Sequence, residues 1–193
     1  GVARMQDFLD RNNAAGRRIT TICHTRPSGS LFGLARLSPF STPAWKALMA
    51  LPTQAERYAA LRDPATRAVL LAEGKEAGFR INPAMLHPLG NAATPDYDLD
   101  RRGSLAQIAV AAGRDPVDVY VDRLLESEGR ELFNFWMFGA ALENQWRFMQ
   151  MPYCIPMLAD TGAHVGFLID ADSPTFLLAE LTRNRGVYTL PEA

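Results

Sequence analysis

Cysteine is scarce in this sequence, and several other features are missing altogether. The 193 residues include two cysteines, Cys23 and Cys154, which are too few for a disulfide framework and fit a reducing compartment. The net charge of −1 provides no field to hold a polyanion, so we expect no nucleic-acid partner. No apolar run reaches the ~18 residues of a membrane helix. Neither end carries a targeting segment, so we expect a cytoplasmic protein with no membrane partner.

Standard site motifs are also absent. The chain has three histidines and no His-x-His pair, whereas a catalytic zinc needs three protein ligands with some local spacing. It also lacks a Gly-x-Gly-x-x-Gly turn and a phosphate-binding loop with its lysine. The sequence therefore offers no complete metal or nucleotide site of its own.

Helix-start signals recur along the chain. Four starts carry their own caps, two as capping boxes and two as aspartate followed by proline: Thr53 with Glu56, Ser104 with Gln107, Asp63-Pro64 and Asp115-Pro116. They predict helices near 54–61 and 64–77, and an αα-hairpin turning at Gly113. Further helices are expected near 44–50 and from Ser173.

Strand signals are fewer. The β-rich run 18–23 and the apolar runs 133–138 and 153–158 predict three strands, and the segment 26–29 is expected to break the first. Since helices outnumber strands by about two to one and separate them, the pattern predicts a helix-rich α/β fold. Residues 78–103, rich in glycine and proline, are expected to form an exposed loop.

Asp160 stands directly after the run 153–158 and is followed by a glycine turn and His164. A carboxylate at the end of a buried strand lies where α/β folds collect catalytic groups, and it could ligate a metal. The alternative is a turn aspartate that accepts backbone hydrogen bonds.

Cys23 and His24 are adjacent and would face opposite sides of a strand, so they do not make a nucleophilic pair. Cys154 with His164 is a further possible dyad.

The closing stretch resembles that of the N-acyl-D-amino-acid deacylases, D-aminoacylase-like members of the amidohydrolase superfamily. The resemblance is carried by Asp160-Thr-Gly-Ala-His164, by the later run Ser173-Pro-Thr-Phe-Leu-Leu178, and more loosely by Thr25-Arg26-Pro27 upstream. It implies the later portion of a truncated (β/α)8 barrel with a helical insertion, so that residues 1–193 form one fragment of a larger catalytic domain. Two features agree with a piece of a longer protein. No initiator methionine precedes Val2, and the capping box at Thr189 predicts a helix that the sequence does not continue.

What the resemblance implies is metal-dependent hydrolysis of the amide C–N bond of an N-acyl amino acid, with zinc in the parent protein. Asp160 matches the residue that binds the metal and moves the proton of the attacking water, and His164 matches a supporting catalytic residue. Arg26 could hold a carboxylate of the small-molecule substrate. The fragment alone is expected to be inactive, to bind no zinc, and to self-associate through open strand edges.

Two other functions stay open. The chain could be a non-catalytic interaction module whose helices 44–77 and 104–128 bury against a partner. It could also be a cysteine hydrolase that uses Cys154.

Overall fold

The computed structural model describes residues 1–26, 28–90, 103–138, 142–157 and 170–193. The fold is helix-rich α/β, as the sequence predicts. The chain divides into two compact units, residues 1–29 with 137–193 (unit 1) and residues 30–136 (unit 2). No described helix is both long and apolar enough to cross a membrane.

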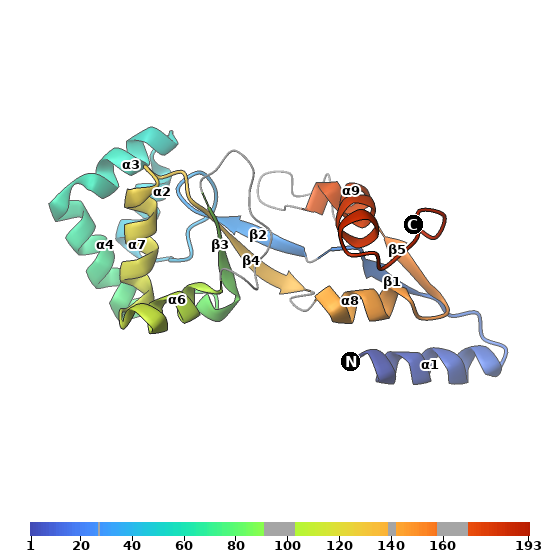
Figure 1. Ribbon diagram of the computed structural model, residues 1–193. Coiled ribbons are helices and arrows are strands. Elements are labelled where there is room, and N and C mark those ends of the chain that lie inside the picture. Colours follow the sequence, from blue (N-terminus) through green and yellow to red (C-terminus); the bar gives the residue numbers. More distant parts are fainter. Residues whose placement is uncertain (27, 91–102, 139–141, 158–169) are drawn as a thin grey trace. The chain divides into compact units, whose positions relative to one another are not determined.

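Unit 2 is a helical layer on one face of a three-stranded sheet (Figure 1). The strands β2 (Ser28–Phe32), β4 (Leu132–Phe138) and β3 (Leu86–Gly90) lie in that order, and β3 runs antiparallel to β4. The helices are α2 (Pro43–Ala50), α3 (Gln54–Arg62), α4 (Pro64–Ala77), α6 (Leu105–Ala112) and α7 (Pro116–Glu126), with a short 3-10 turn, η1 (Pro83–Met85).

The helix caps in unit 2 are those that the sequence predicts. Thr53 with Glu56 and Ser104 with Gln107 form complete capping boxes, and the carboxylates of Asp63 and Asp115 accept backbone N–H bonds at the starts of α4 and α7. Gly113 ends α6 with φ 62°, a left-handed conformation that glycine adopts at no steric cost. The αα-hairpin is therefore confirmed.

One continuous apolar core joins these helices to the sheet. Trp45, Leu61, Leu70, Leu105 and Leu124 are fully buried against Phe133 and Leu86 from the strands. Tyr120 lies at the centre, with its ring centroid 4.7 Å from that of Phe133.

The first strand ends at His24, before the segment 26–29 that was expected to break it, although Ser28 and Gly29 already belong to the next strand, β2. One expectation about an irregular segment is wrong. Within 78–103, the part 83–90 forms η1 and β3, and Leu86 and Leu89 are buried, so this part is not an exposed loop. Residues 91–102 lie outside the described part of the chain.

Unit 1 is built on a two-stranded parallel sheet. β1 (Thr21–His24) pairs with β5 (Cys154–Met157), with Thr21 opposite Cys154 and His24 opposite Met157. The helix α8 (Leu142–Met149) packs on both strands, and α1 (Val2–Ala14) packs on α8. Asn13 ties the end of α1 to the chain that leads into β1, since its amide donates to the carbonyl of Ile19 and accepts from the N–H of Ile19.

The end of the chain in unit 1 is helical. A 3-10 turn, η2 (Asp170–Asp172), leads into α9 (Ser173–Phe176), which continues as a π-helix, η3 (Leu177–Asn184). The helix expected from Ser173 is thus confirmed. The strands expected at 18–23 and 153–158 are present as β1 and β5, and their carboxyl ends lie at the same edge of the sheet because the two strands are parallel.

Candidate functional site

The residues that follow β1 form a buried polar cluster with α8 and the start of α9. We call Thr25, Arg26, Gln145, Asp172, Ser173 and Phe176 the strand-end cluster. Thr25 and Arg26 are 4% and 2% exposed, and Ser173 is 1% exposed. A set of polar side chains this deeply buried requires close pairing, because an unpaired buried polar group is costly.

Arg26 is the centre of this cluster. Its guanidinium pairs with the carboxylate of Asp172, and its Cζ lies 5.5 Å from the centroid of the Phe176 ring. The backbone carbonyl of Arg26 accepts a hydrogen bond from Nε2 of Gln145 at 3.0 Å. The planar fork of arginine suits both a carboxylate and an aromatic face, which explains why this residue can be buried here.

Thr25 makes a second contact between the end of β1 and the start of α9. Its hydroxyl donates to the backbone carbonyl of Ser173 at 2.9 Å. Asp172 is the N-cap residue of α9, yet its carboxylate makes no cap hydrogen bond and lies on Arg26 instead. The start of α9 is therefore held against the end of β1 by two independent polar contacts.

The sequence identified only part of this cluster. Arg26 was predicted to hold a carboxylate of the substrate, and among the described residues its guanidinium pairs with the carboxylate of Asp172. Asp160 and His164 lie outside the described residues, and β5 ends three positions before Asp160 in the sequence. Gln145, Asp172 and Phe176 were not predicted as site residues. Only Asp172 had a signal in the sequence, because it stands directly before Ser173-Pro174, where a helix was expected to begin.

His24 occupies the last position of β1. It is partly buried, and its buried Nδ1 atom has no hydrogen-bond partner among the residues that the structure describes. The same holds for the buried Oε1 of Gln145 in α8. Within the described part of the chain, one imidazole nitrogen and one amide oxygen near the carboxyl end of β1 therefore accept or donate no hydrogen bond.

The two thiols do not have the character of an activated nucleophile. Burial, and secondarily the charge of Cys154, raises the pKa of Cys23 to about 11. Burial also raises the pKa of Cys154. A catalytic cysteine needs the opposite shift, because the thiolate is the reactive form, so these surroundings argue against Cys154 as a nucleophile.

The described residues do not fit a zinc site. Within the ranges that the structure describes, no three His, Cys, Asp or Glu residues gather closely enough to hold a metal ion. A catalytic zinc needs three protein ligands. We therefore derive no step of a reaction through a metal.

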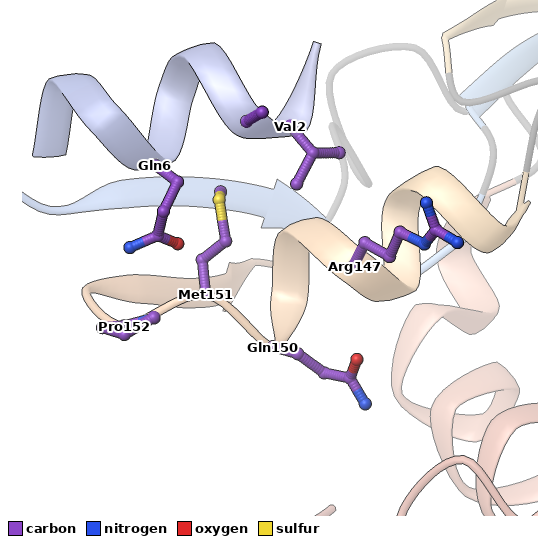
Figure 2. A pocket seen from close by; sticks show the side chains of 7 residues that line it. Val2, Gln6, Arg147, Gln150, Met151 and Pro152 are labelled. Atoms are coloured by element: carbon purple, nitrogen blue, oxygen red, sulfur yellow. The ribbon is translucent and has the colours of Figure 1, made fainter.

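A surface pocket of about 420 Å³ lies elsewhere in unit 1, between the start of α1 and the end of α8 (Figure 2). Met151 reaches toward α1 near Gln6, whereas Gln150 points away from that helix. Arg147 at its margin is engaged by Glu143 at 2.6 Å. None of the residues predicted from the sequence lines this pocket, so it adds nothing to the strand-end cluster.

Comparison with known proteins adds no family to this picture. No protein-family model, no curated protein and no solved structure matches the chain.

Proposed function

We propose that this chain is part of an amidohydrolase that hydrolyses the amide C–N bond of an N-acyl amino acid, in the manner of the D-aminoacylase-like enzymes that its closing stretch resembles. The observation that supports this proposal is the parallel pair β1–β5, whose carboxyl ends share one edge. Parallel strands joined by helical crossovers are the units of α/β barrels, and catalytic groups follow the carboxyl ends of such strands. The truncated-barrel interpretation of the helix-rich α/β fold belongs to the same proposal.

Two residues would carry the reaction in the proposed enzyme. Asp160, three positions after the end of β5 in the sequence, takes the proton of the attacking water and returns it to the departing amine. His164 supports it. The zinc that the resemblance implies would need ligands from beyond the described residues. We therefore expect this chain alone to be catalytically inactive.

Arg26 would bind the substrate carboxylate in this proposal. The guanidinium now holds Asp172, which is 45% exposed at its side chain. A carboxylate in solution can therefore compete with Asp172 for the arginine fork, and exchange of one carboxylate for another keeps the buried charge paired.

The alternative of a helical interaction module has less support. The helices between residues 44–77 and 104–126 bury their apolar faces in the core of unit 2 itself. Single exposed residues such as Val69 and Val110 are normal for a protein surface. An exposed apolar pair in unit 1 favours self-association. Ile22 and Ile155 lie opposite each other in the parallel sheet and are 61% and 52% exposed.

The proposal is tested by replacing Asp160 with alanine in the intact protein that contains this chain. We expect turnover of an N-acyl-D-amino acid to fall by about 10²–10⁴-fold, the usual contribution of a positioned proton carrier, while the thermal midpoint is unchanged. The matched control is Asp122→Asn, which removes a carboxylate from the surface of α7 and should leave turnover intact. Normal turnover in Asp160→Ala, or no hydrolysis of any N-acyl amino acid by the unchanged protein, would refute the assignment.

A further inference from the structure

The two cysteines, far apart in the sequence, lie on neighbouring strands of unit 1. In the parallel pair, Thr21 is opposite Cys154 and Cys23 is opposite Pro156. Side chains alternate between the faces of a strand, and opposite residues point to the same face. Cys23 and Cys154 therefore share one face as diagonal neighbours.

Their separation suits a bridging ion better than a direct bond. With strands about 4.8 Å apart and about 3.3 Å of rise per residue, diagonal neighbours have Cα atoms about 8 Å apart. A disulfide requires Cα atoms within about 7 Å, so it would need movement of the backbone. A metal ion between two sulfur atoms adds two metal–sulfur bonds to the span, each about 2.3 Å for Zn²⁺, so it can join the pair without that movement.

The surroundings of the thiols are partly desolvated. Both cysteines are free and partly buried. The Sγ of Cys23 donates to the backbone carbonyl oxygen of His24 at 3.3 Å, and it lies 3.9 Å from the carbonyl oxygen of Gln145 in α8.

We propose that Cys23 and Cys154 form a two-thiolate binding site for a soft monovalent cation, Cu(I). On binding, two S–H bonds break, two metal–sulfur bonds form, and two protons pass to the solvent. Copper enters as Cu(I) and stays Cu(I), so no oxidant or reductant is needed. The site is independent of the proposed deacylase activity.

The ligand set selects for a soft ion. Thiolates favour Cu(I), whereas carboxylate and carbonyl oxygens favour Mg²⁺ and Ca²⁺. A structural zinc takes four ligands, and the part of the chain that the structure describes brings no three ligating residues together. Two sulfur atoms on a half-buried face suffice for an ion that accepts two-fold coordination.

The test is an anaerobic titration of the reduced 193-residue chain with Cu(I) in competition with a chromogenic Cu(I) chelator. We expect one Cu(I) bound per chain, with release of two protons. Cys23→Ser and Cys154→Ser should each weaken binding by at least about 100-fold, and the double variant should be little weaker than either.

His24→Asn is the matched control, because His24 is adjacent to Cys23 but on the opposite face of β1. It should leave Cu(I) affinity unchanged. Undiminished affinity in either cysteine variant, one Cu(I) per two chains, or equally tight binding of Zn²⁺ would overturn the proposal.

A second measurement does not depend on how well the variants fold. The unchanged chain is loaded with Cu(I), treated with an alkylating agent, and analysed by mass spectrometry. The expected result is that both thiols are labelled more slowly than in the folded copper-free chain under the same conditions. Slowing of one thiol alone, or of neither, would refute a shared site.

Discussion

The two units of the chain bury polar and apolar side chains in different proportions. Most described buried residues of unit 2 are apolar and form a continuous core with Trp45, Tyr120 and Phe133 at its centre, although Glu131 and Asn134 are buried there as well. The described buried residues of unit 1 include the polar side chains of Thr25, Arg26, Gln145 and Ser173, beside a few apolar ones. Apolar burial stabilises a fold directly, whereas buried polar groups cost stability unless each is paired. Unit 2 thus has the character of a packed scaffold, and the stability of unit 1 depends more on how its polar groups are paired.

The largest expected effect tests the scaffold character of unit 2. Trp45→Ala should reduce the free energy of unfolding by about 3–5 kcal/mol, because Trp45 is fully buried beside Phe40 and its indole N–H donates to the carbonyl of Leu70. Urea unfolding followed by circular dichroism measures it. Val110→Ala, at a site 81% exposed, should change stability by less than about 0.5 kcal/mol. A similar effect of both substitutions would contradict the assignment of Trp45 to the stabilising core of unit 2.

The second prediction concerns the half-buried sheet of unit 1. Because the pKa of Cys23 is about 11 in place of 9.0, its alkylation at pH 8 should be about 100-fold slower than that of the same thiol in the unfolded chain. The folded chain holds this proton more tightly than the unfolded chain, so stability should fall as the pH rises from about 9 toward about 11. Rates of iodoacetamide labelling across this pH range provide the measurement, and equal rates in the two states would show that Cys23 is exposed.

The third prediction sharpens the polar character of unit 1. Asp172→Asn removes one carboxylate partner of the buried guanidinium of Arg26, and we expect a loss of about 2 kcal/mol, moderated because Asp172 is half exposed. Combining it with Arg26→Met should recover part of this loss, since the buried charge is then gone. The control Asp122→Asn breaks an exposed pair with Arg114 and should have no measurable effect.

The smallest effect concerns a helix end in unit 2. Ser104→Ala removes the side chain that caps α6 and should cost about 1 kcal/mol, which thermal unfolding can measure. Gln107→Ala removes the reciprocal half of the same box, so the double variant should lose less than the sum of the two single losses. Strict additivity would show that the two side chains do not act as one cap.

Local signals predicted local structure well. The caps at Thr53, Ser104 and Asp115 depend on side chains three residues or fewer from the backbone groups that they satisfy, and all three are present. The strand β3 was missed because Pro88 and Gly90 are typical of turns. It is an edge strand in the order β2-β4-β3, where proline is tolerated, since one side of the strand needs no hydrogen bonds.

Long-range contacts were not available from the pattern. The pairing of Arg26 with Asp172 and of Thr25 with Ser173 joins segments that the sequence separates by most of its length. Nothing in the neighbourhood of Arg26 specifies which carboxylate it meets. The sequence analysis predicted a substrate carboxylate as the partner of Arg26, which stays a prediction, and it did not foresee the pairing with Asp172.

The insertion of unit 2 between β1 and β5 has a consequence for folding during synthesis. Thr21 leaves the ribosome long before its partner Cys154, so the parallel sheet cannot form until all of unit 2 has been made. Closing so long a loop is slow, and it becomes less costly once the intervening residues have condensed into a compact body. The connectivity therefore sets the order of folding. Unit 2 is expected to fold first, and the strand-end cluster forms only after the C-terminal helix has been synthesised.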